Sequence, residues 1–372
     1  MKILRQVIKQ YHIPILIVLT CKILILFLIA KLSASIVPNS RALHLNVWEL
    51  WNVWDAPHYI SVASSGYQKI GDEANFIILL PFFPLLIYIF KFIFQTSFLI
   101  SGYLVSFVSS VLLAIMLYKL VLLDYSKKTA ILAVLVLFLF PTSFFLHIPY
   151  TEAVFMLVSV VAFYFARKRR YFLSFLFVSL AASTKIAGLA LIPAIFAEIF
   201  FSDRQNFNKR NITIGLLISL SGFLFYLFLN YFLWGDFFYF TIIQKQHWFE
   251  TFAPFGQGLI TVFKSLSWRT GLEMIMLGYG QIVAFFLALI LSLYVLIKVR
   301  ISYGIFSIIV LWVSYSMSFW ICMPRYILSI FPMFIGIALL SENILFKYSW
   351  IYLSTILLLI LSLIFLQYGP VL

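Results

Sequence analysis

Long apolar runs separated by short polar breaks dominate this sequence. A helix needs about 20 apolar residues to cross a bilayer, and the longer runs meet that length. The pattern predicts an all-α polytopic membrane protein with about eleven membrane segments in one domain, residues 1–372, without internal repeats. The expected segments are 13–36, 97–122, 129–146, 153–166, 171–184, 186–201, 211–233, 276–297, 303–321, 327–341 and 349–367.

Two parts of the pattern are too short to be ordinary spans. Residues 79–94 contain two prolines, and a crossing there would reverse the side of the basic loops that follow, so we expect an external juxtamembrane helix. Residues 171–184 and 186–201 have basic residues at both outer ends, which predicts a helical hairpin with its tip in the membrane or a cavity. Lys185 lies at that tip and needs an anionic partner there.

The composition agrees with a membrane protein: 64% of residues are hydrophobic, 10% are charged, and the mean hydropathy is +1.08. The net charge of +14 comes largely from short loops such as 167–170 and 204–210. This distribution is typical of cytoplasmic loops, and it excludes a nucleic-acid partner. Residues 37–78 and 234–275 are then expected to be external. The first apolar run lacks a clear cleavage site and is expected to remain as an anchor.

The most polar part of the first predicted external loop is rich in aromatic residues. Asp55 follows Trp48, Trp51 and Trp54 and precedes Pro57. A charged acid in such surroundings at a membrane face is costly unless it has a partner or a task. Two interpretations remain open for Asp55: a catalytic acid, or a cap of the helix that begins near Pro57.

Glu152, Lys185 and Arg325 are predicted on the same side as Asp55. A channel would carry polar residues through its full depth, and a secondary transporter would carry them near the midplane. A one-sided set favours an enzyme acting on a lipid phosphate. Lysine and arginine can hold an anionic leaving group, and a carboxylate can accept the proton of an attacking hydroxyl. Structural alternatives are a helix cap for Glu152 and a snorkelling Arg325. A lipid or lipid-linked sugar flippase is the alternative function.

Six motifs occur in order between residues 54 and 334. They are Trp54-Asp55-Ala56…Tyr59-Ile60…Ala63…Gly66-Tyr67, Phe82-Phe83-Pro84-Leu85, Pro141…Phe144-Phe145…Tyr150-Thr151-Glu152, Thr184-Lys185…Gly188, Gly235-Asp236 with Gln246-His247-Trp248, and Pro324-Arg325-Tyr326…Phe331-Pro332. Together they resemble the motifs of PIG-V-type mannosyltransferases, the GPI mannosyltransferase 2 family and its prokaryotic relatives. The resemblance implies a GT-C glycosyltransferase fold. It also implies a polyprenyl- or dolichyl-phosphate sugar donor, usually mannose, and a catalytic acid at Asp55.

We therefore expect Asp55 to be catalytic and Lys185 and Arg325 to bind the donor phosphate. The expected substrate-binding residues are Trp54, His58, Tyr59, Glu152, Gln246, His247, Trp248 and Tyr326. The expected partners are the lipid bilayer, the lipid-linked donor and a glycolipid or glycan acceptor. The protein is expected in the cell membrane if prokaryotic, or in the endoplasmic reticulum membrane if eukaryotic, with its site on the external or lumenal side.

No cofactor or metal is expected. The sequence has no phosphate-binding glycine loop and no His, Asp and Glu set with convincing metal spacing. Cys21 and Cys322 lie in apolar runs and are expected to be small core residues outside any disulfide.

Overall fold

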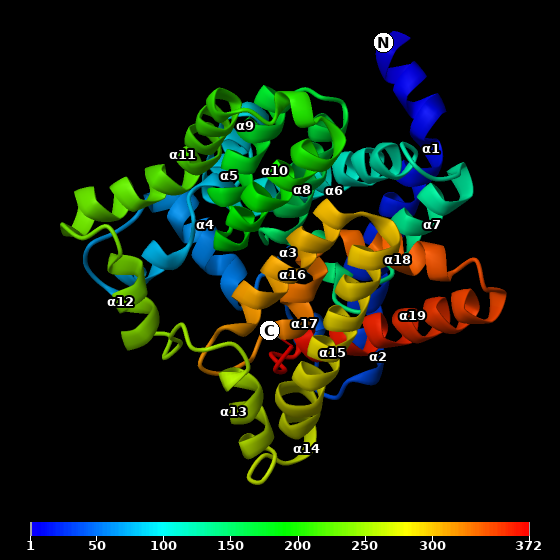
Figure 1. The fold of residues 1–372 in the computed structure, drawn as a ribbon. Coiled ribbons are helices and arrows are strands. Elements are labelled where there is room, and N and C mark those ends of the chain that lie inside the picture. The colour runs from blue at the N-terminus through cyan, green and yellow to red at the C-terminus, as the bar shows by residue number, and fades with distance from the viewer. Residues whose placement is uncertain (1, 372) are drawn as a thin grey trace.

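The computed structural model describes residues 2–371, in which helices are joined by short turns (Figure 1). Its only β pairing within those residues is an isolated bridge between Phe252 and Met317. The first half contains α1 (Lys2–Ile23), η1 (Leu24–Leu28), α2 (Ile29–Ile36), η2 (Arg41–Leu43), α3 (Val47–Leu50), α4 (Asp55–Ser65), η3 (Asp72–Ile78), α5 (Phe82–Phe94), α6 (Phe98–Val121), α7 (Lys127–Phe138), η4 (Ser143–Leu146), α8 (Glu152–Arg167) and α9 (Tyr171–Ala182). The second half contains η5 (Ile186–Ala190), α10 (Leu191–Ser202), η6 (Arg204–Asn206), α11 (Lys209–Trp234), α12 (Tyr239–Gln246), α13 (Gln257–Ser265), α14 (Gly271–Glu273), η7 (Met274–Tyr279), α15 (Gly280–Tyr294), η8 (Val295–Val299), α16 (Ile301–Tyr315), α17 (Met323–Tyr326), η9 (Ile327–Ser329), α18 (Pro332–Leu340) and α19 (Ile344–Leu366).

Each of the eleven segments expected from the sequence contains a helix. Within residues 2–371, five helices are long and apolar enough to cross a membrane, and two bent helix pairs raise the number of candidate spans to seven. The five are Gln10–Ile36, Phe98–Val121, Lys209–Trp234, Gly271–Val299 and Ile344–Leu366. Helices α9, α10 and α16 are apolar but shorter. The chain is therefore an integral membrane protein whose helices differ widely in length.

Local sequence signals explain where several of these helices begin and end. Ser97, Ser126, Asn208 and Asn343 each accept a backbone N–H with the side chain at the start of α6, α7, α11 and α19, respectively. Such caps satisfy N–H groups that lack a partner within the helix. Gly235 ends α11 with φ of +75°, a conformation that favours glycine.

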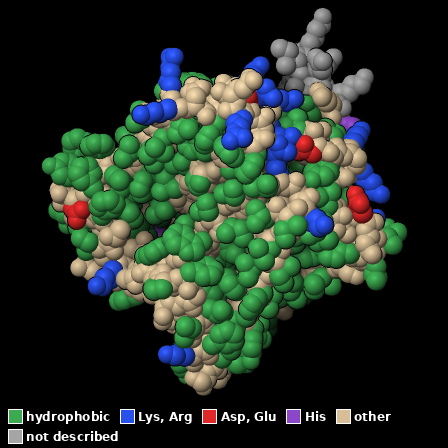
Figure 2. Space-filling model, in the orientation of Figure 1, with side chains coloured by type: hydrophobic (Ala, Val, Ile, Leu, Met, Phe, Trp, Pro, Cys, Tyr) green, Lys and Arg blue, Asp and Glu red, His purple; other side chains and the backbone are tan. Residues whose placement is uncertain are grey.

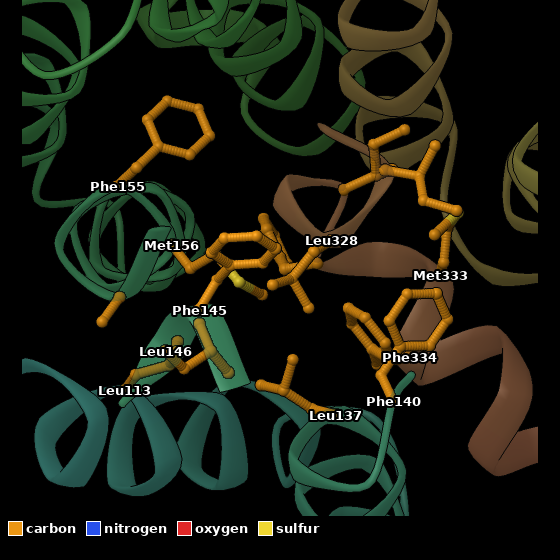
Figure 3. Packing of buried hydrophobic residues seen from close by; sticks show 14 of the residues in the cluster. Leu113, Leu137, Phe140, Phe145, Leu146, Phe155, Met156, Leu328, Met333 and Phe334 are labelled. Atoms are coloured by element: carbon orange, nitrogen blue, oxygen red, sulfur yellow. The ribbon is translucent and has the colours of Figure 1, made fainter. Parts of the chain in front are cut away.

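The buried core is centred on two helices. Helix α8 packs against α6, α9 and α10, while α18 packs against α7, α15 and α16. Figure 3 shows Phe140 facing Phe334 in this core, and their rings meet edge to face with centroids 5.3 Å apart. Around the core the surface is largely hydrophobic, with Lys and Arg side chains gathered along the upper edge of the face in Figure 2. This distribution fits a bundle surrounded by lipid.

The two short segments singled out by the sequence meet each other. Helix α5 is bent by 112° from η3 and packs against α4 and α6. Helices α9 and α10 form the expected hairpin, with η5 just after its tip. The backbone N–H of Phe82 at the start of α5 donates to the carbonyl oxygen of Ser183 at that tip, over 3.1 Å. The hairpin tip therefore lies beside the first predicted external loop.

Candidate functional site

The site begins at the turn that leads into α4. The buried Trp51 donates its indole N–H to the carbonyl oxygen of Leu26 over 3.2 Å, and this bond anchors the turn to the first span. Trp54 precedes α4 with φ of +57°, a region that non-glycine residues rarely adopt. Strain of this kind persists only where the surroundings hold it, and it is frequent at functional sites.

Tyr150 holds that turn from the other side. Its hydroxyl donates to the carbonyl oxygen of Val53 over 3.0 Å and accepts the backbone N–H of Asp55 over 3.1 Å. These two bonds fix the start of α4 against the start of α8. Among residues 2–371, the hydrogen bond found for the Asp55 carboxylate is accepted from Arg325 and does not come from the backbone of α4. Tyr150 belongs to one of the six motifs, but its role at this turn becomes visible only in the fold.

Glu152 and Lys185 form a buried ion pair. Lys185 Nζ lies 2.8 Å from Glu152 Oε1, and the Glu152 side chain is only 1% exposed. The predicted need of Lys185 for an anionic partner is thereby confirmed. Gly188 allows the hairpin tip that carries Lys185 to pack tightly against the end of α9. A side chain at this position would come within 2.4 Å of the backbone of Ala181. Among residues 2–371, the contacts found for the Glu152 carboxylate are with Lys185 and Arg325, not with the backbone of α8.

Arg325 connects this pair to Asp55. Its Nη1 lies 2.7 Å from Asp55 Oδ2, and its Nε lies 3.6 Å from Glu152 Oε1. The guanidinium also faces three aromatic rings, those of Phe145, Tyr150 and Tyr326, at 5.3 to 5.5 Å. The side chain is 9% exposed, so it does not snorkel to the surface.

We call Asp55, Glu152, Lys185 and Arg325 the site cluster. It contains two acids and two bases, so its formal charge is zero. Its hydrogen bonding is incomplete: Glu152 Oε2 and Arg325 Nε are buried and find no hydrogen-bond partner among residues 2–371. Asp55 is the most open member, with 29% of its side chain exposed. An unsatisfied guanidinium N–H is suited to binding an anion, and an accessible carboxylate is suited to accepting a proton.

The second predicted external segment lies against the first. The imidazole of His58 stacks on Phe76 with centroids 4.4 Å apart and meets the edge of Trp248 at 5.7 Å. The Trp248 indole N–H is buried and has no hydrogen-bond partner in the described part of the chain. Burial lowers the pKa of His58 below its usual value, and the nearby Asp55 opposes that shift. An aromatic wall with an unpaired donor is suited to a sugar ring.

Glu250 lies near the site but belongs to none of the six motifs. Residues 251–253 and 316–318 exchange backbone hydrogen bonds, which carry the preceding Glu250 toward the start of α17. Its Oε2 accepts from Gln244 Nε2 over 3.0 Å. Burial raises the pKa of its carboxyl group, while Gln244 and Arg325 oppose the shift. No motif marked Glu250, because its proximity to Arg325 depends on long-range pairing.

The remaining candidate residues occupy different environments. Tyr59 is buried on α4 beside Tyr150, with ring centroids 6.4 Å apart. Gln246 and His247 are exposed at the end of α12, and the His247 ring meets Trp248 edge to face at 5.3 Å. Trp54 is half-buried, and its indole N–H has no partner. The fold thus brings together the charged candidates, while Gln246 and His247 stay at the periphery.

Among residues 2–371, no group of three or more His, Cys, Asp or Glu side chains has an arrangement that could hold a metal ion. Cys21 and Cys322 are buried free thiols.

The profile of the family described as mannosyltransferase (PIG-V) matches residues 12–303. No curated protein sequence matches the chain significantly. Among solved structures, the crystal structure of ArnT from Cupriavidus metallidurans bound to undecaprenyl phosphate is similar, with a TM-score of 0.52 and 17% identity. The match covers 78% of this chain and 56% of that chain. At this identity the likeness establishes a shared GT-C fold, which the sequence resemblance had implied.

A second structural match is the Archaeoglobus fulgidus oligosaccharyltransferase tethered to an acceptor peptide. Its TM-score is 0.48 at 14% identity, over 97% of this chain and 55% of that chain. The chain spans little more than half the length of either solved protein.

Proposed function

This chain belongs to the mannosyltransferase (PIG-V) family, and from that premise we propose that it transfers a sugar, mannose, from a polyprenyl-phosphate donor to a glycolipid or glycan acceptor at the external membrane face. Family membership supports a membrane glycosyltransferase. The donor class is supported by ArnT, a solved protein of the same fold that is bound to undecaprenyl phosphate.

The observation that carries this proposal is the site cluster. An open carboxylate, Asp55, lies 2.7 Å from a buried guanidinium, and a second cation, the partly buried Lys185, lies on the other side of Glu152. The phosphate of a lipid-linked sugar needs cations, and the attacking hydroxyl needs a base. A flippase would need only the phosphate-binding half of this arrangement.

In the proposed reaction, the acceptor oxygen attacks the anomeric carbon and forms the new glycosidic bond. The bond from that carbon to the phosphate oxygen breaks, and the electron pair leaves with polyprenyl phosphate. Asp55 takes the proton of the acceptor hydroxyl, while Arg325 and Lys185 stabilise the charge that grows on the phosphate. Direct displacement from the opposite face inverts the anomeric centre. Glu152 is the positioning residue that keeps both cations in place.

The aromatic residues around the cluster complete the proposed site. Trp54, His58, Tyr59, Trp248 and Tyr326 offer ring faces and N–H or O–H groups of the kind that recognise sugars. The exposed Gln246 and His247 are assigned to the rim, where a large acceptor would first touch the protein.

The direct test is a transfer assay with purified protein and radiolabelled polyprenyl-phosphate mannose. The expected result is release of polyprenyl phosphate, with the radiolabelled mannose either joined to an acceptor or released as free sugar by transfer to water. The assay is repeated with the protein in sealed vesicles. If the donor crosses the bilayer intact and is not cleaved, the protein is a flippase and not a transferase.

The external location of the site has its own test. We expect a membrane-impermeant thiol reagent to label Ser65→Cys in intact cells but to spare Gln205→Cys, with Cys21 and Cys322 replaced by alanine in both. Both residues are exposed, at the end of α4 and in η6. Labelling of Gln205→Cys alone would place the site cluster on the cytoplasmic side.

A further inference from the structure

The cation assigned to the donor phosphate already has an anionic partner. Arg325 Nη1 is bonded to Asp55 Oδ2 at 2.7 Å, and Asp55 is the proposed base. That bond is the one hydrogen bond found for the Arg325 side chain within residues 2–371. A guanidinium has five N–H donors in a planar fork that matches a phosphate, so Arg325 has donors to spare but its charge is neutralised.

The other cation of the site cluster also has an anionic partner before any ligand arrives. Lys185 Nζ forms an ion pair with Glu152 Oε1 at 2.8 Å, and the Glu152 side chain is buried. The formal charge of the four side chains is zero before any ligand arrives. A phosphate that enters this low-dielectric site is attracted strongly only if one of the two cations is released from its carboxylate. Asp55 is the carboxylate that can release its cation, because it is partly exposed and accepts a single hydrogen bond from Arg325.

Resting on the function proposed above, we propose that Asp55 and the phosphate of the lipid compete for Arg325, and that protonation of Asp55 during transfer hands Arg325 over to the leaving phosphate. Before the reaction, Arg325 is shared between the carboxylate and a phosphodiester with one negative charge. Afterwards, Asp55 carries the acceptor's proton and is neutral. The departing phosphate monoester has gained the electron pair of the broken bond.

The charges balance through this exchange. One negative charge disappears from Asp55 as the phosphate gains one, so the total charge of the site stays constant while Arg325 changes its partner. Proton acceptance and leaving-group stabilisation are thereby coupled through one side chain. The coupling has a consequence that can be measured without catalysis: neutral Asp55 should bind polyprenyl phosphate more tightly than charged Asp55.

The test is equilibrium binding of undecaprenyl phosphate to purified Asp55→Asn and to the unmodified protein. Asparagine imitates the neutral acid in shape and in charge. We expect Asp55→Asn to bind about 5-fold more tightly or better, the lower end of typical coupling between linked equilibria. The matched control is Asp72→Asn, which removes one negative charge from an exposed position in the same external segment and should leave affinity unchanged.

A second pair of variants locates the effect in Arg325. In an Arg325→Gln background, Asp55→Asn should no longer tighten binding, because there is no guanidinium left to release. Equal or weaker binding by folded Asp55→Asn overturns the competition. So does an undiminished gain in the Arg325→Gln background. These outcomes are separate from the fate of the proposed function, which fails if the unmodified protein releases no polyprenyl phosphate in the transfer assay.

Discussion

Helix α8 carries a charged cluster at each end, and the two clusters have the same balance of acidic and basic residues. The site cluster lies at its start, with Glu152. At its end, about 22 Å away for 15 residue steps at 1.5 Å each, Arg167 joins Asp124, Glu198 and Arg300 in what we call the basal cluster. Each cluster contains two carboxylates and two cations. They differ in how completely those charges are satisfied.

The basal cluster uses almost every polar atom it has. Glu198 accepts from Arg300 Nε at 2.8 Å and from Arg300 Nη2 at 2.9 Å, and also from Ser202 and Ser302. Both oxygens of Asp124 accept from Arg167. The site cluster instead leaves atoms of Glu152 and Arg325 unbonded. A complete network of this kind holds helices together, whereas an incomplete one retains capacity for a ligand. The comparison predicts that mutations will lower activity at one end and stability at the other.

The largest expected effect is that of Asp55→Asn on catalysis. Loss of a general base lowers the rate about 100- to 10,000-fold. Folding should be spared, because Glu152 remains near Arg325 as a counter-charge. Transfer rate and thermal unfolding of the purified variant are the measurements. A well-folded variant with near-normal transfer would remove Asp55 from the role of base.

Glu198→Gln is the corresponding change in the basal cluster. Breaking a buried ion pair lowers the free energy of unfolding by about 3 kcal/mol when one charged partner remains. Here the remaining partner is Arg300, which is only partly exposed. We expect a lower melting temperature with an unchanged kcat/KM for the folded fraction. Glu342→Gln, an exposed acid in the turn before α19, is the matched control and should alter neither quantity. A fall in kcat/KM without loss of stability would contradict this division.

Lys185→Gln should produce a smaller kinetic effect than Asp55→Asn. Loss of one charge-assisted bond to the donor phosphate costs about 1.5–3 kcal/mol, which corresponds to a 10- to 150-fold fall in kcat/KM for the donor. Lys185→Arg keeps the charge next to Glu152 and is expected to retain most of the activity. Normal donor kinetics in Lys185→Gln would leave Lys185 as a structural partner of Glu152 alone.

The smallest expected effect concerns Glu250 and pH. Burial raises the pKa of its carboxyl group above the usual 4.5, so the folded protein holds this proton more tightly than the unfolded chain does. Its contribution to stability is therefore complete below pH 4.5 and is lost as pH rises through the folded pKa. Melting temperatures of Glu250→Gln and the unmodified protein should differ more at pH 7 than at pH 4, in favour of the variant. A pH-independent difference would mean that Glu250 does not titrate in this range.

The sequence by itself determined the class of protein and the positions of its helices. Apolar runs must become helices in lipid, because each backbone polar group needs a partner within its own segment. That rule needs no tertiary information, and a helix occurs in each predicted segment. The same local logic required an anion for Lys185, although it did not say which one.

Only the tertiary structure decided which charges meet. The Arg325–Asp55 pair joins residues 270 positions apart, and the Lys185–Glu152 pair joins residues 33 apart. Periodicity carries no information about such distances, since any acid on the same side was equally compatible with the pattern. Glu250 stayed unnoticed for the same reason, and Glu152 looked like a substrate ligand or a cap until its enclosure was visible. The chain specifies its helices locally, whereas the ion pairs follow from how those helices pack, because buried charges require partners that only packing can supply.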